Sequence, residues 1–253
     1  MIAALMLDLD DAPDFPGNSA VALGRPLAAY PWIAARGAIQ IARRFVVTSS
    51  PPVKSAAVQY DAVIIDPPPQ LPAGGLPALR ALLVHGARAI ETEVKSEGDP
   101  LEMLVVLLSN AATVTKDLID KGIEALQTRP ELDSAATVSA QNRFHPAFAQ
   151  KENAGGILEP AAAPITDGTG DVFYPDFGAQ ILRPKHVNSE AADRPFPWLG
   201  KRVLPLKQWG GGPIDYSWQI PSLEYWLRKH GVSDAGGSME LQPKPQPQTK
   251  PRN

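Results

Sequence analysis

The chain contains no cysteine, which excludes disulfide bonds, cysteine metal ligands and thiol nucleophiles. No apolar run approaches the roughly 20 residues that a membrane-spanning helix needs, and the first residues lack the basic start and cleavage site of a secretory signal. Lys and Arg total 24 against 27 Asp and Glu, so there is no large charge of one sign to attract nucleic acid or a membrane surface. We therefore expect a soluble, cytoplasmic protein with no nucleic-acid and no membrane partner.

What the chain does contain is an alternation of short apolar segments and helical stretches, typical of an α/β domain with a mostly parallel, Rossmann-like sheet. The expected strands are residues 2–7, 45–48, 62–65, 103–108 and 135–138, and later 178–183 and 202–206. The expected helices are residues 27–42, 77–94, 115–127 and 221–230. The helix over 115–127 has the clearest signals, because Thr115 can cap it and Asp117 lies in its first turn.

The middle of the chain changes character. Glycines and prolines at Gly155, Gly156, Pro160, Pro164 and Gly168 divide it into short segments, which predicts an excursion from the sheet rather than another βα unit. Such excursions often make subunit contacts, so we expect a protruding dimerisation element. Residues 232–253 are rich in Pro, Gln and Lys and are expected to be a disordered tail after a single domain of residues 1–231.

The loop after the first strand is acidic, where a nucleotide enzyme of this class would place glycines and a basic residue. Phosphates are normally held by backbone N–H groups, a helix N-terminus and a lysine or arginine. The run Asp8-Leu9-Asp10-Asp11-Ala12-Pro13-Asp14-Phe15-Pro16 supplies four aspartates and two prolines instead. Any interpretation of the chain as a nucleotide enzyme must account for this loop.

One interpretation of the loop is a phosphatase. Asp8 and Asp10 after an apolar strand resemble the first motif of the haloacid-dehalogenase-type phosphatases, because alternate residues leaving a strand point to the same side. Ser49 would then supply the hydroxyl motif, but the later lysine and paired aspartates of that family have no convincing match. The alternative is that the aspartates are solvated turn and cap residues.

Several longer stretches carry a different resemblance. Residues 105–138 contain Leu-Leu-Ser-Asn-Ala-Ala-Thr-Val-Thr before the expected helix, and a second block runs through 174–180, 206–211 and 214–221. With residues 23–31, they resemble the cytidylyltransferases that make CMP-activated acidic sugars, namely acylneuraminate cytidylyltransferase and related CMP-sugar synthetases. The resemblance covers most of the chain and implies a nucleotidyltransferase-type sheet.

The resemblance also implies a chemistry. In that family a sugar hydroxyl attacks the α-phosphate of CTP and pyrophosphate leaves, so Mg²⁺ and cationic side chains must stabilise phosphate charge. The family's first loop is rich in Arg, Lys and Gly, whereas an alignment on residues 15–17 puts no lysine or arginine into this loop. Its remnant would be Asp8, Asp10, Asp11, Asn18 and Ser19.

Other family positions depart or survive individually. The Asp-x-Asp pair that holds magnesium in that family is reduced here to Asp215, and the alternative for Asp215 is a structural role in the turn before a helix. Asn110 and Thr113 follow a strand at the edge where open α/β sheets bind ligands. They are substrate-pocket candidates, as is Arg143, which with His145 and Arg183 resembles the acidic-sugar side of the family's pocket. A structural role is the alternative for each of them.

The resulting hypothesis is a CMP-sugar-synthetase-like protein with an eroded CTP/Mg site. It would be a non-catalytic structural or regulatory partner of an enzyme complex, either as a homodimer or as a heteromer with an active homologue or another enzyme subunit. The alternative is an active cytidylyltransferase that activates an acidic sugar with CTP and holds Mg²⁺ on Asp8, Asp10, Asp11 and Asp215. The phosphatase is a further alternative.

Overall fold

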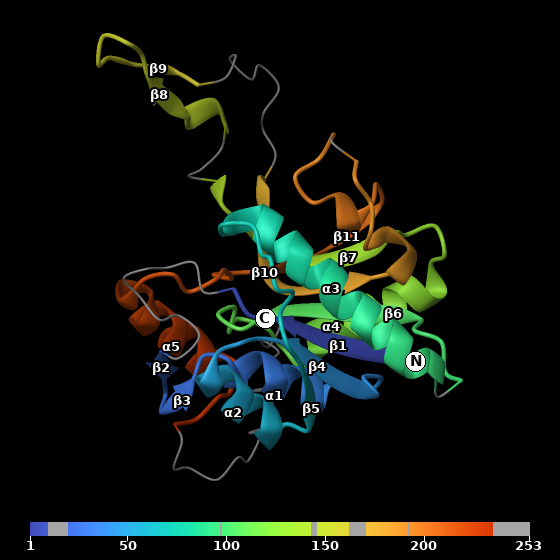
Figure 1. Cartoon of the computed structure of the whole chain (residues 1–253). Coiled ribbons are helices and arrows are strands. Elements are labelled where there is room, and N and C mark those ends of the chain that lie inside the picture. The colour runs from blue at the N-terminus through green and yellow to red at the C-terminus, as the bar shows by residue number, and fades with distance from the viewer. Residues whose placement is uncertain (10–19, 97, 143–145, 162–170, 192, 235–253) are drawn as a thin grey trace, which may run out of the picture.

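A seven-stranded sheet forms the centre of the molecule (Figure 1), with the strand order β11-β7-β10-β6-β1-β4-β5. The computed structural model describes residues 1–9, 20–96, 98–142, 146–161, 171–191 and 193–234. Every neighbouring pair in the sheet is parallel except at β10, which is antiparallel to both β6 and β7. The strands are β1 (Ile2–Leu7), β4 (Arg43–Val47), β5 (Ala62–Ile65), β6 (Met103–Leu108), β7 (Ser134–Ala140), β10 (Phe173–Leu182) and β11 (Val203–Gln208). The expected mostly parallel sheet is confirmed.

Helices cover both faces of this sheet. The α-helices are α1 (Ala29–Gly37), α2 (Pro51–Gln59), α3 (Gly75–Ser96), α4 (Lys116–Thr128) and α5 (Ile220–Lys229). Short 3₁₀ turns are η2 (Pro146–Phe148), η3 (Pro184–His186), η4 (Pro197–Leu199) and η5 (Ser217–Gln219). Apolar side chains of α1, α2 and α4 pack on one face, and those of α3 pack on the other. All six residues of β1 are buried, as expected for a central strand covered on both sides.

The predicted elements agree closely with these bounds in the first half of the chain. Strands 62–65 and 103–108 were predicted with their observed limits, and Thr115 caps α4 by accepting a hydrogen bond from the Leu118 amide. The helix predicted over 27–42 is shorter, because the chain turns after Gly37. Helix α2 was not predicted, since its opening Pro51-Pro52 resembles a break, although proline fits the first turn of a helix.

Two small hairpins lie outside the main sheet. One pairs β2 (Val21–Ala22) with β3 (Arg25–Pro26). The other pairs β8 (Gln150–Glu152) with β9 (Leu158–Pro160) and projects well away from the sheet (Figure 1), so the predicted protrusion is confirmed. Its role in dimerisation stays a prediction. Most of the expected tail, residues 235–253, lies outside the described residues.

Within the described ranges, no helix combines the length and hydropathy that crossing a bilayer requires.

Candidate functional site

Asp8 lies at the carboxyl end of β1 and contacts the strands on either side. The hydroxyl of Thr48, just after β4, donates to Asp8 Oδ2 at 2.5 Å, and the hydroxyl of Ser109, just after β6, donates to Asp8 Oδ1 at 2.7 Å. These three residues meet because parallel neighbours end at the same edge of a sheet. Asp8 therefore connects the ends of three adjacent strands.

The two hydroxyls are deeply buried, since Thr48 and Ser109 each expose only 1% of their surface. Each carboxylate oxygen of Asp8 thus accepts a hydrogen bond from a group that water cannot satisfy. Ser49, the candidate for the hydroxyl motif of a phosphatase, is exposed, whereas the hydroxyl that contacts Asp8 belongs to the preceding residue, Thr48. A strand that ends in Thr or Ser beside a strand that ends in Asp was the available signal.

The other predicted loop residues, Asp10, Asp11, Asn18 and Ser19, lie outside the described residues. The same holds for Arg143 and His145. Their predicted roles stay predictions.

Asn110 and Asp215 meet at the same carboxyl edge, although they are far apart in the sequence. The side-chain amide of Asn110 donates to Asp215 Oδ1 at 3.2 Å and to the Ile214 carbonyl at 3.4 Å, and the Ile214 amide donates to the Asn110 carbonyl at 3.0 Å. The amides of Asp215 and Tyr216 both donate to Gln219 Oε1. Asp215 thus belongs to the turn before η5, while its side chain is exposed.

Mg²⁺ usually binds one or two carboxylates together with substrate phosphates and waters. Among the described residues, no three His, Cys, Asp or Glu side chains gather so as to hold a metal ion. Asp215 offers one exposed carboxylate beside the Asn110 amide. These groups fit a weak metal site that needs a substrate's phosphates, and they do not fit a metal cage made by the protein alone.

Thr113 is 1% exposed and makes two contacts within the fold. Its hydroxyl accepts a hydrogen bond from the Gly212 amide at 3.2 Å, and its carbonyl accepts one from Gln208 Nε2 at 2.9 Å. One contact goes to the last residue of β11 and the other to the segment that follows it. The geometry favours the structural alternative for Thr113 over a substrate contact.

Asp176 is a buried carboxylate that sequence reasoning missed. It is 3% exposed, and its Oδ2 accepts hydrogen bonds from Ser139 Oγ at 2.7 Å and Gln208 Nε2 at 2.9 Å. Its Oδ1 accepts one from the Gly178 amide at 3.2 Å. Phe177 between them has φ of 57°, in the left-handed region, where β10 shifts register against β7. An acidic residue shortly before the glycine that begins an expected strand was the available signal.

Arg183 lies at the opposite edge of the sheet, because β10 runs antiparallel to its neighbours. Its guanidinium donates to the carbonyls of Leu126 at 2.7 Å and Leu132 at 3.0 Å, near the end of α4. It therefore caps a helix C-terminus in the region where cations are favourable. This position is far from the edge that carries Asp8 and Asp215.

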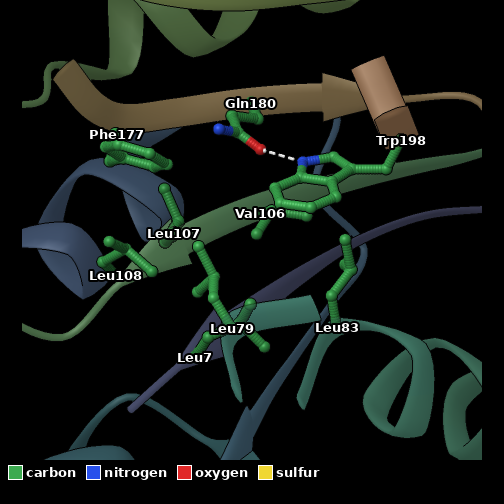
Figure 2. A pocket seen from close by; sticks show the side chains of 9 residues that line it. All are labelled: Leu7, Leu79, Leu83, Val106, Leu107, Leu108, Phe177, Gln180 and Trp198. Atoms are coloured by element: carbon green, nitrogen blue, oxygen red, sulfur yellow. Dashed lines mark hydrogen bonds between the residues drawn. The ribbon is translucent and has the colours of Figure 1, made fainter. Parts of the chain in front are cut away.

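An apolar cavity lies between α3 and the sheet, close beneath the carboxyl edge (Figure 2). Figure 2 shows Trp198 Nε1 donating to Gln180 Oε1, a bond of 2.8 Å. The interior volume of about 10 Å³ matches about one water molecule. The lining residues are Leu7, Leu79, Leu83, Val106, Leu107, Leu108, Phe177, Gln180 and Trp198. With a single polar side chain, this cavity offers no phosphate site.

Comparison with known proteins gives a clear result for the fold. No family model matches the chain, and no curated protein matches it. Among solved structures, it superposes on CMP:2-keto-3-deoxy-manno-octonic acid synthetase complexed with CTP, with a TM-score of 0.61 and 13% identity over 90% of this chain and 98% of that one. The chain has a cytidylyltransferase-like fold.

A second solved structure supports the same assignment. 4-Diphosphocytidyl-2C-methyl-D-erythritol synthase from Anaerococcus prevotii superposes with a TM-score of 0.62 and 11% identity, over 90% of this chain and 96% of that one. At such identities the likeness concerns the fold alone. The cytidylyltransferase-like fold nevertheless extends over nearly the whole chain, which confirms the fold expected from the sequence.

Proposed function

We propose that this protein is a non-catalytic structural or regulatory partner of an enzyme complex, built on a cytidylyltransferase-like fold with an eroded CTP/Mg site. The observation that carries the proposal is the loop that begins at Asp8. Residues 8–19 contain no lysine or arginine, and the carboxylate of Asp8 is bound by the hydroxyls of Thr48 and Ser109. The first residue of the loop thus serves the fold rather than a phosphate.

The electrostatics of the loop also oppose CTP. Two like unit charges 4 Å apart repel by about 1 kcal/mol in bulk water and by about 4 kcal/mol near a protein surface. One carboxylate next to a phosphate would thus weaken binding by roughly 5- to 1,000-fold. Asp8, Asp10, Asp11 and Asp14 all occupy this stretch of sequence. Without a compensating cation, the loop therefore disfavours CTP, the nucleotide bound in the first of the similar solved structures.

The partner proposed for this role is a second copy, an active homologue or another enzyme subunit. The protruding β8–β9 hairpin supports this, because Phe148, Ile157 and Leu158 on and beside it are 66–71% exposed. Exposed apolar groups gathered on a projecting element are typical of interaction surfaces. Sedimentation of the protein alone and with candidate partners tests this point, with Ile157→Ser and Leu158→Ser expected to weaken any association.

Catalysis is tested directly by pyrophosphate release. Purified protein is incubated with Mg²⁺, CTP and eight- or nine-carbon acidic sugars, with an active CMP-sugar synthetase as the positive control. We expect no pyrophosphate, and no heat of binding in calorimetry at millimolar CTP. Pyrophosphate release with any of these sugars would refute the non-catalytic proposal.

The second candidate is an active cytidylyltransferase that uses CTP, Mg²⁺ and an acidic sugar. It is favoured by the exposed carboxylate of Asp215, which the Asn110 amide contacts at the edge that also carries Asp8. In this case Mg²⁺-dependent pyrophosphate release would occur, and Asp215→Asn would abolish it while leaving the thermal midpoint unchanged. The matched control is Glu131→Gln, which neutralises an exposed carboxylate in the turn that follows α4.

A further inference from the structure

The segment of residues 209–215, called here the crossing segment, runs from the end of β11 over the carboxyl edge of the sheet. It is held there by three backbone amides. The Gly211 amide donates to Ser139 Oγ at 3.0 Å, the Gly212 amide donates to Thr113 Oγ1 at 3.2 Å, and the Ile214 amide donates to the Asn110 carbonyl at 3.0 Å. The last of these bonds immediately precedes Asp215.

Asp176 lies beneath this segment and determines how its partners are oriented. A serine hydroxyl has a single hydrogen and two lone pairs. The hydrogen of Ser139 is committed to Asp176 Oδ2 at 2.7 Å, so a lone pair of the same oxygen faces the Gly211 amide. The amide nitrogen of Gln208 is likewise shared between Asp176 and the Thr113 carbonyl. Asp176 thus orients Ser139, which binds the Gly211 amide, and Gln208, which immediately precedes the segment.

The backbone of the crossing segment also packs directly on this carboxylate. A Cβ atom added to Gly211 would lie 2.3 Å from Asp176 Oδ2 and 2.7 Å from Gln208 Nε2, closer than real Cβ contacts. Only glycine allows so close an approach at this position. The position of the segment and the presence of Asp176 are therefore coupled through direct contact.

We propose that Asp176 is a positioning residue that fixes the crossing segment over the carboxyl edge and so places Asp215 beside Asn110. This inference goes beyond the proposed function and holds whether or not the protein turns over CTP. A carboxylate is required because it only accepts hydrogen bonds. Its neighbours Ser139, Gln208 and Gly178 all donate to it, so an amide in its place would direct a donor at another donor.

The chain contains a matched control, Asp133, whose contacts lie at the start of β11 rather than at its end. Asp133 accepts hydrogen bonds from the amides of Lys201 at 2.8 Å and Arg202 at 3.0 Å, just before β11 begins. Both aspartates therefore accept hydrogen bonds from β11 or its flanking residues, Asp133 just before the strand begins and Asp176 where it ends. Replacing either by asparagine makes the same chemical change at opposite edges of the sheet.

Amide hydrogen exchange followed by NMR on the full chain tests the inference in Asp176→Asn, Gly211→Ala and Asp133→Asn. In the first two variants, the backbone amides at positions 211, 212 and 214 should exchange about tenfold faster or more, since each variant disrupts a contact that holds the segment. The side-chain amide signals of Asn110 should also shift. Amides of α4 should keep their protection. Asp133→Asn should instead affect the start of β11.

Unchanged exchange in the crossing segment of both variants would overturn the inference. So would a uniform increase over β6, β7 and β10, because that result would show general destabilisation rather than positioning. Gly211→Ala disturbs the contact between Asp176 and the crossing segment by changing the segment instead of the aspartate. It therefore tests the inference if Asp176→Asn does not fold. In that case, fast exchange confined to residues 209–215 supports the inference and its absence rejects it.

Discussion

Replacement of Asp8 by alanine distinguishes a structural role of this carboxylate from a role in ligand binding. The change removes the acceptor of two hydrogen bonds and leaves the hydroxyls of Thr48 and Ser109, each 1% exposed, without that partner. Hydrogen bonds to charged groups contribute about 1.5–3 kcal/mol each, and an unsatisfied buried group costs about 1–3 kcal/mol. Water reaches the half-buried Asp8 and reduces both values. We therefore expect a loss of about 2–4 kcal/mol in the free energy of unfolding.

The opposite sign is expected if the aspartates are held together for metal or substrate. Removing one member of an acidic cluster then relieves repulsion, and stability rises, as it often does when functional residues are replaced. Urea denaturation of the unaltered chain, Asp8→Ala, Ser109→Ala and the double variant measures the difference. The double-mutant cycle should give a coupling energy of about 1 kcal/mol or more between Asp8 and Ser109. A stabilised Asp8→Ala, or a coupling near zero, would refute the structural role.

Three further predictions concern the scaffold. Gly122→Ala should lower the free energy of unfolding by roughly 1–2 kcal/mol, because overpacking against Ile181, 2.6 Å from the added carbon, outweighs the gain in helix propensity; a stabilised variant in denaturant titrations would contradict this. Thr115→Ala should cost about 1 kcal/mol by loss of the helix cap, with Thr115→Ser retaining most of it in the same titration. Burial lowers the pKa of His186. Burial raises the pKa of Asp133, but hydrogen bonds from the Arg202 and Lys201 amides together with the nearby charges of His186 and Arg202 outweigh it, so the pKa of Asp133 is lowered. The folded state thus binds fewer protons, so stability should be fully present at pH 7, fall as the pH drops below about 6.5 through the lowered pKa of His186, and fall again in the acid range of Asp133. His186→Asn should flatten the first decline in urea titrations against pH, and an unchanged decline would exclude His186 as its source.

Periodicity predicted the parts of the fold that local sequence determines. Strand β6 and helix α4 were recognised because apolar residues repeat at the period of a buried strand or of a helix face, and because Thr115 marks where the helix begins. Helix α2 was missed for a local reason as well. In sequence, a pair of prolines indicates a break between elements. That this pair begins a helix becomes clear only from the packing of Val53 and Ala57 on the core.

The candidate site depended on contacts between distant segments, which periodicity does not report. Asn110 and Asp215 were both named from the sequence, but their contact joins residues 105 positions apart. The contacts of Thr113 could not be predicted from the sequence, because they join it to Gln208 and Gly212, about 95 to 99 positions away. Asp176 was missed because its three donors come from β7, from β11 and from a register shift within β10. A strand sequence alone does not identify such a group as a hydrogen-bond centre.

The bonds at Asp8 have an evolutionary consequence. A lineage that acquired a lysine or arginine at position 8 would leave the hydroxyls of Thr48 and Ser109 without their acceptor. A lineage that first replaced either hydroxyl would lose one of the bonds that join three strands. Each single step is expected to lower stability before any nucleotide contact is gained. The carboxylate at position 8 is therefore difficult to replace one substitution at a time, because Thr48 and Ser109 on the two neighbouring strands both depend on it as an acceptor.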